Sequence, residues 1–288
     1  MTPVAADTGE ALPENIVAGI DAAARRHLVD SDGVRICWRN FGHCGPPLVL
    51  LHGGQGSWLH WVRNVEPLAR HFSVWVPDLP GYGDSDAPAG TTLASLLEPT
   101  IATLDALIGA SAPVFLAGFS FGGLVAAHLA ARRGKVEKLA LFGPAGHGGR
   151  LRRTRALLGW RDAADAAELA RRMRHNLAAH MLHEEASIDA LALHVHTVSS
   201  LRTRFRSQEI SLGGGLQQAL ERSDAEMLLV WSEHDLAAEP AVLAPALTEG
   251  WPKRRAHLVS GAGHWVQYER AAAVDRLLCD WFLGDRAA

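Results

Sequence analysis

Short, continuously apolar runs alternate along the chain with longer stretches in which apolar residues recur about every 3.6 positions. A short run of this kind is typical of a parallel strand that is buried on both faces. The longer stretches have the spacing of helices and cover residues 58–70, 93–109 and 121–133. Their alternation predicts an α/β fold, in which a mostly parallel sheet carries helices on both faces. The predicted strands are RICWRNF, PLVLLHG, SVWVPDLPG, PVFLAGFS, KLALFGP, EMLLVWS and AHLVSGAGH.

The alternation of strands and helices stops at about residue 146 and resumes after about residue 215. The intervening stretch is rich in Arg, Ala, His and Leu, and glycine-rich segments border it on both sides. We interpret residues 146–215 as a helical cap over the carboxyl ends of the strands. The predicted core is then formed by residues 23–145 and 216–288, and residues 1–22 are a loosely held leader.

Composition and charge narrow the class of protein. The chain of 288 residues is 48% hydrophobic with a formal net charge of −3, so it can bury a large core and has no excess of basic residues. Neither nucleic acid nor an anionic membrane is therefore expected as a partner. No apolar run is long enough to span a bilayer, and the N-terminus lacks the pattern of a secretory signal. The three cysteines are scattered and do not have the spacing of a disulfide framework. We therefore predict a cytoplasmic protein.

The strongest local motif is GFSFGG, which follows a predicted strand and opens a predicted helix. A serine hydroxyl reacts as a nucleophile only when it is exposed, aimed and next to a base. A sharp strand–turn–helix turn would expose Ser120, and its crowded backbone needs the small neighbours Gly118 and Gly122. The backbone N–H of Phe121, at the start of the helix, would then face developing negative charge.

A second glycine-rich segment, HGGQG at residues 52–56, comes directly after a predicted strand. Its glycines would allow the backbone to approach a substrate oxygen closely. We predict that the N–H of Gly54 or that of Gln55 helps to bind the oxyanion, and the sequence leaves the choice open. His52 is interpreted as a residue that shapes this loop.

The third feature is a carboxylate and a histidine that follow the last two predicted strands. His264 lies between glycine-rich residues and a tryptophan, and Asp235 lies in the turn just past the preceding strand. A histidine that takes the serine proton needs a buried carboxylate to fix its tautomer. We assign these roles to His264 and Asp235, with Glu233 as the rival acid.

No cofactor and no catalytic metal are predicted. The pairs His180/His183 and His194/His196 have no supporting pattern such as HExxH, and we interpret them as surface or cap-packing residues. No GxGxxG or Walker-type loop is present to bind a nucleotide.

Together with the segment PDLPGYGDSD at residues 77–86, these motifs resemble those of the α/β-hydrolase superfamily over about residues 26–145 and 220–283. The resemblance implies an α/β-hydrolase fold with a mostly parallel eight-stranded sheet and a helical cap after strand 6. It also implies the chain order serine, acid, histidine. Ser120 argues against the haloalkane dehalogenases and epoxide hydrolases of this fold, which carry an aspartate at that position.

The C-terminal part is similar to the carbon–carbon bond hydrolases that cleave ring-fission products. In those enzymes a tryptophan follows the catalytic histidine, and Trp265 does so here. Two positions depart from the subfamily: Phe119 stands where it usually has asparagine, and His194 and His196 stand where it uses a cap arginine.

The most economical hypothesis is a serine hydrolase that acts on a carboxylic ester through an acyl-enzyme. The expected substrate is a small, largely apolar molecule in a pocket formed in part by Trp265, Phe119 and Trp58. The alternatives are a carbon–carbon bond hydrolase of vinylogous diketones and a ligand-binding protein without turnover. A further alternative is a peptidase that holds the amine of its substrate through Glu184 or Glu185. Whether the protein forms a homodimer is left open.

Overall fold

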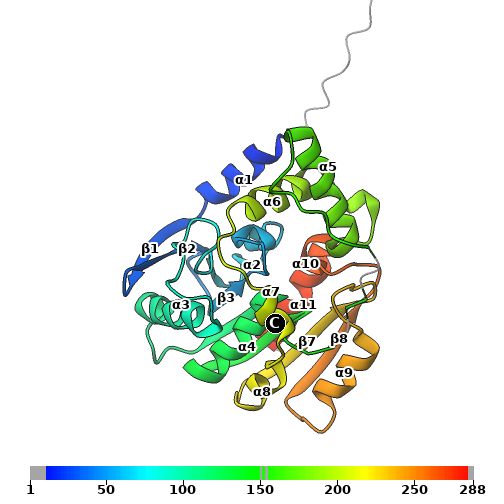
Figure 1. The fold of residues 1–288 in the computed structure, drawn as a ribbon. Coiled ribbons are helices and arrows are strands. Elements are labelled where there is room, and N and C mark those ends of the chain that lie inside the picture. Colours follow the sequence, from blue (N-terminus) through cyan, green and yellow to red (C-terminus); the bar gives the residue numbers. More distant parts are fainter. Residues whose placement is uncertain (1–10, 150, 153–154, 285–288) are drawn as a thin grey trace, which may run out of the picture.

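The computed structural model describes residues 11–149, 151–152 and 155–284 (Figure 1). A single eight-stranded sheet runs through the centre in the order β1-β2-β4-β3-β5-β6-β7-β8. β1, β2 and β4 pair antiparallel, and the pairs from β4 onward are parallel. The predicted eight-stranded, mostly parallel sheet is confirmed. Its strands are β1 (Arg25–Ser31), β2 (Val34–Phe41), β3 (Pro47–Leu51), β4 (Ser73–Pro77), β5 (Val114–Phe119), β6 (Val136–Phe142), β7 (Glu226–Ser232) and β8 (Arg254–Val259).

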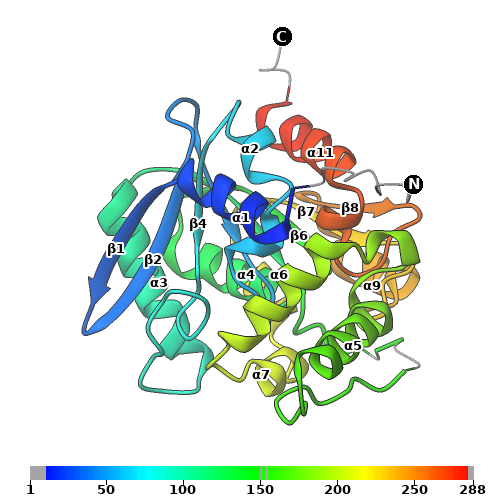
Figure 2. The same cartoon turned by 90° about the horizontal axis from the view of Figure 1, so that it is seen from above.

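Helices cover both faces of the sheet (Figures 1 and 2). Two short helices are of the 3-10 type, η1 (Trp58–Trp61) and η3 (Glu185–Ser187), and η2 (Leu177–Met181) is a π-helix. The α-helices are α1 (Pro13–Ala22), α2 (Val65–Leu68), α3 (Leu93–Ile108), α4 (Phe121–Arg133), α5 (Ala166–Asn176), α6 (Ala190–Leu201), α7 (Gln208–Leu212), α8 (Leu216–Glu221), α9 (Pro240–Thr248), α10 (Val266–Glu269) and α11 (Ala271–Leu283).

Strand β3 shows how the sheet divides the core into two layers. Leu48 and Leu50 belong to a buried cluster with α11 and part of the cap, whereas Val49 and Leu51 belong to a second cluster with α3, α4 and α8. All four side chains are fully buried. A continuous apolar run is therefore required here, because successive side chains of a strand point to opposite faces.

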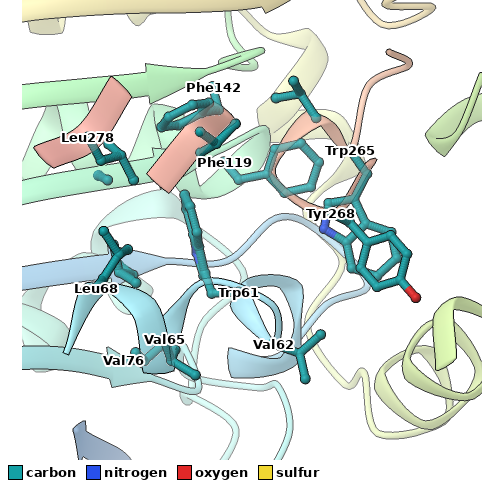
Figure 3. Packing of buried hydrophobic residues seen from close by; sticks show 14 of the residues in the cluster. Trp61, Val62, Val65, Leu68, Val76, Phe119, Phe142, Trp265, Tyr268 and Leu278 are labelled. Atoms are coloured by element: carbon teal, nitrogen blue, oxygen red, sulfur yellow. The ribbon is translucent and has the colours of Figure 1, made fainter. Parts of the chain in front are cut away.

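The stretch predicted as one helix over residues 58–70 is instead two short helices, η1 and α2. Pro67 lies within the first turn of α2. Proline lacks an N–H and its ring clashes with the carbonyl four residues earlier, so Pro67 disfavours one continuous helix here, although α3 accommodates Pro99. The apolar spacing remains, and it buries Trp61 against Phe142 with ring centroids 5.7 Å apart (Figure 3).

Between β6 and β7 the described chain consists of helices and loops, including α5, η2, η3, α6 and α7. The first of these helices lie at the same end of the molecule as α1, which contacts α6 (Figure 1). Within the predicted leader, residues 13–22 thus form a helix that packs on the molecule, and Asp21 is ion-paired with buried Arg39 at 2.5 Å. Residues 1–10 of the leader lie outside the described residues. None of the described helices is long and apolar enough to cross a membrane.

Asp275 of α11 provides a pH-dependent test of the packing. Burial raises the pKa of its carboxyl to about 6 despite a hydrogen bond of 2.8 Å from Asn64. A raised carboxyl pKa means that the folded state loses stability as pH rises from about 4 to about 6. Asp275→Asn should therefore stabilise the protein by about 1 to 2 kcal/mol at pH 7.5, after allowance for solvent screening, and not at pH 4. Thermal unfolding at both pH values measures this, and an equal effect at both would contradict it.

Candidate active site

Ser120 occupies the sharp turn between β5 and α4, as its motif predicts. Its backbone has φ 54° and ψ −117°, a conformation that residues other than glycine rarely adopt. A Cβ on Gly118 would lie 2.3 Å from the carbonyl oxygen of Gly122, and one on Gly122 would lie 2.3 Å from that of His52. Both neighbours must therefore be glycine. The N–H of Ser120 donates to the Phe142 carbonyl at 2.8 Å, which fixes the turn over the end of β6.

Asp235 and His264 form a buried pair beyond the ends of β7 and β8. His264 Nδ1 lies 2.9 Å from Asp235 Oδ1, and each side chain is only 1% exposed. Burial alone would raise the pKa of Asp235. The charge and hydrogen bond of His264 and the N–H of Ala237 outweigh it and hold that pKa below its usual value. Asp235 is thus a carboxylate that accepts the Nδ1 proton, which leaves Nε2 of His264 as the basic nitrogen.

The loops that carry Ser120 and His264 converge at the carboxyl ends of the central strands. Phe119 places its ring 4.9 Å from the His264 ring, centroid to centroid. A Cβ on Gly143, the residue after β6, would lie 2.9 Å from His264 Cε1 and 2.8 Å from Asp235 Oδ2. His264 Nε2 is buried and has no hydrogen-bond partner among the described residues, so it has no bond to Ser120 Oγ either. Catalytic hydrogen bonds often form only in the substrate complex, and the vacant nitrogen is what a base requires.

The glycine-rich segment after β3 lies against the serine turn. A Cβ on Gly53 would be 3.2 Å from that of Ser120, and one on Gly54 would be 3.7 Å from that of Phe121. The N–H of Gly53 is used, because it donates to His60 Nδ1 at 3.1 Å. The N–H groups of Gly54, Gln55 and Phe121 form no hydrogen bond with any described residue. These three donors are the ones that the sequence analysis proposed for an oxyanion.

His52 has the structural role expected of it. Its Nε2 accepts the N–H of Leu79 at 2.9 Å, and its Nδ1 donates to the carbonyl of Gly53 at 2.8 Å. Burial lowers the pKa of its imidazole, so the ring is neutral and both nitrogens are occupied. It links the glycine-rich segment to the loop after β4.

The three residues predicted to line the pocket are all buried. Phe119 lies between the rings of His60 and His264. Trp265 stacks on Tyr268 with ring centroids 4.3 Å apart (Figure 3). Trp58 packs against Phe41 and lies under the guanidinium of Arg39, and these contacts account for it as a core residue.

Two residues near the site were not predicted to belong to it. His60 accepts the N–H of Gly53, and its own carbonyl accepts the indole N–H of Trp265 at 2.9 Å, so it connects both loops. Burial holds the pKa of its imidazole well below the ordinary value, which keeps the ring neutral. His180, in the cap, places its ring 5.1 Å from that of His264.

Cys37, Asp78 and Asp84 form the one group of potential metal ligands found in the described parts of the chain. The guanidinium of Arg39 lies among them and donates to Asp78 at 3.0 Å and to Asp84 at 2.6 Å. The positive charge of Arg39 therefore already occupies the centre of this cluster. Asp78 also accepts the N–H groups of Trp58 and Asp84, and so holds the two loops together.

Comparisons with known proteins agree with this fold. A family model described as the alpha/beta hydrolase fold matches residues 46–271. The chain is 30% identical over 267 residues to the dihydrolipoyllysine-residue acetyltransferase component of the acetoin cleaving system of Cupriavidus necator, covering 90% of this chain and 69% of that protein. It is 28% identical over 294 residues to a 2-hydroxy-6-oxononadienedioate/2-hydroxy-6-oxononatrienedioate hydrolase of Cupriavidus pinatubonensis, covering 94% and 99%.

Among solved structures, an esterase from a Rhodococcus species matches with a TM-score of 0.73 and 25% identity, covering 89% of this chain and 97% of the esterase. The family model spans the serine turn, the cap region and the histidine loop, all within the fold described above. The chain therefore belongs to the α/β-hydrolase fold family and is a hydrolase.

Proposed function

We propose that the protein hydrolyses carboxylic esters through an acyl-enzyme on Ser120, with His264 as base and Asp235 as the acid that orients it. The observation that carries this proposal is the buried 2.9 Å contact between His264 Nδ1 and Asp235 Oδ1, which leaves Nε2 vacant next to the Phe119–Ser120 turn. The ester assignment needs only these groups and two oxyanion donors.

In the first half-reaction, Ser120 Oγ attacks the carbonyl carbon as Nε2 of His264 takes its proton. The carbonyl oxygen becomes an anion and is held by the N–H of Phe121 and that of Gly54 or Gln55. Each such donor is worth about 3 to 4 kcal/mol of barrier. The bond to the alcohol oxygen then breaks, and the alcohol leaves with the proton from His264.

In the second half-reaction, His264 removes a proton from water as its oxygen attacks the acyl carbon. The same N–H groups hold the second oxyanion, and Ser120 leaves with the proton that His264 returns. Asp235 keeps its negative charge throughout and stabilises the imidazolium formed in each half. The carboxylic acid product and the free serine complete the cycle.

Cleavage of a carbon–carbon bond in a vinylogous diketone is the second candidate. It is supported by the similarity to the nonadienedioate hydrolase over nearly the full length of both proteins, and by Trp265 directly after His264. Phe119, which replaces the usual asparagine, argues for the ester. The peptidase alternative loses support because Glu184 and Glu185 are ion-paired with Arg270 and Arg174.

A substrate panel separates these candidates. We expect the purified protein to hydrolyse short-chain p-nitrophenyl and aliphatic esters with a kcat/KM at least about tenfold above that for a 2-hydroxy-6-oxodienoate, because ester hydrolysis needs only the serine, the histidine–carboxylate pair and two oxyanion donors. A higher kcat/KM for the dienoate would replace the ester assignment with carbon–carbon bond hydrolysis. Binding of esters without turnover would favour a ligand-binding protein.

A further inference from the structure

Glu269, the last residue of α10, lies at the junction of the cap and the histidine loop. Its Oε2 accepts the N–H of Gly263 at 2.7 Å. Its Oε1 accepts the N–H of Glu184 at 2.7 Å and that of His183 at 3.1 Å. One carboxylate thus binds the backbone just before His264 and the backbone of the cap.

This carboxylate is buried and is not part of an ion pair. Glu269 is 8% exposed, and it forms no ion pair within the described ranges. The neighbouring Arg270 is directed elsewhere, to Glu184 and to the Gly261 carbonyl, each at 2.5 Å. Burying a charge is costly unless hydrogen bonds compensate it, and here backbone N–H groups supply that compensation. A neutral side chain would suffice if the site served packing alone.

The backbone around His264 leaves little space for adjustment. A Cβ on Gly263 would lie 2.7 Å from the nitrogen of His183 and 2.9 Å from the carbonyl oxygen of Met181. On the other side of His264, the N–H of Trp265 donates to that same carbonyl at 2.7 Å. Both chain neighbours of His264 are therefore bonded to, or in close contact with, cap residues 181–184.

The same cap segment also contacts the His264–Asp235 pair through its side chains. The ring of His180 lies 5.1 Å from that of His264. The ring of His183 stacks on that of His234, the residue before Asp235, with centroids 3.5 Å apart and planes 13° apart. A shift of this segment would consequently reach both members of the pair.

We propose that Glu269 is a positioning residue that clamps the cap to the histidine loop and thereby sets the imidazole of His264 against Asp235. The expected effect on the kinetics rests on the proposed function. The clamp itself can be tested without a substrate. Misplacement of a catalytic group by about 1 Å lowers the rate about 100-fold. Loss of the clamp should accordingly lower kcat more than it changes KM.

Glu269→Gln is the most informative variant, because it keeps the size and shape of the side chain. An amide has one acceptor oxygen, so its NH₂ group must face either Gly263 or the cap N–H groups. We expect kcat for the best ester to fall about 100-fold while KM changes less than about threefold. Glu184→Gln is the matched control: it removes the exposed ion pair to Arg270 at the same junction, and kcat should stay within about twofold.

A second variant separates the effect of side-chain length from that of charge. Glu269→Asp keeps the negative charge but is one methylene shorter, so it can reach only one of the two sets of N–H groups. Positioning predicts that its kcat falls as in Glu269→Gln. A kcat at the wild-type level in either variant would overturn the proposal.

Proton NMR provides the readout that is independent of activity. A histidine Nδ1–H bonded to a buried carboxylate gives a resonance far downfield, and Asp235→Asn identifies it by its loss. We expect that resonance to be lost or broadened in Glu269→Gln and retained in Glu184→Gln. Its full retention in a folded Glu269→Gln protein would overturn the clamp. Loss of the resonance in Glu269→Gln would support the clamp whether or not the protein turns over an ester. If no ester were turned over, only the proposed function would fail.

Discussion

Replacing Ser120 with alanine is expected to lower kcat/KM for ester hydrolysis by about 10⁴- to 10⁶-fold. The substitution removes only the hydroxyl, because alanine can keep the Cβ contacts of the turn between β5 and α4. The oxyanion donors and the His264–Asp235 pair remain, so the residual rate should be that of direct attack by water. Initial rates with a p-nitrophenyl ester measure the effect.

The Ser120→Ala protein should also remain folded, since Ser120 Oγ forms no hydrogen bond with the described residues. A thermal midpoint near that of the wild type, together with the lost activity, would locate the defect in the chemistry. Equal hydrolysis by the variant and the wild type would contradict the assignment of Ser120.

Asp235→Asn is expected to lower kcat about 10⁴-fold with the fold intact. The amide oxygen can keep the place of Oδ1, where it accepts the Nδ1 proton and the N–H of Ala237. The variant then lacks the negative charge that stabilises the imidazolium. Glu233→Gln is the matched control, because Glu233 was the rival acid and its side chain is half exposed. Its Oε2 instead accepts the N–H of Gly261 at 3.1 Å.

We therefore expect Glu233→Gln to retain kcat within about threefold. Steady-state kinetics of the two variants, made side by side, decide between the two acids. A larger loss in Glu233→Gln than in Asp235→Asn would transfer the role to Glu233.

Much of the fold could be predicted because its signals are local. The helix predicted over residues 121–133 is α4, with the same bounds, and the one predicted over 93–109 is α3 within one residue. β1 was not among the predicted strands. It is an edge strand with mostly exposed residues, so it lacks the apolar run that marks a buried strand. The turn residues Asp32 and Gly33, both with positive φ, are the signal that could have identified its hairpin with β2.

The candidate site was predictable only where function demands a particular residue type at a particular turn. Ser120 and Gly122 are of that kind, because the turn tolerates few alternatives. His60 and Glu269 act through contacts between distant segments, with Gly53 in one case and with cap residues 183–184 in the other. The hydrophobic periodicity of a single segment does not reveal such contacts. The pair His264 and Asp235 was identified by position after strands, and its hydrogen bond required the structure.

Covalent trapping tests the central claim most directly. A fluorophosphonate ester should inactivate the wild-type protein with one equivalent bound, and peptide mass spectrometry should locate the phosphonyl group on Ser120. His264→Ala should react far more slowly, because the hydroxyl then lacks its base. A phosphonyl group on any other residue, or an undiminished rate in His264→Ala, would contradict the account.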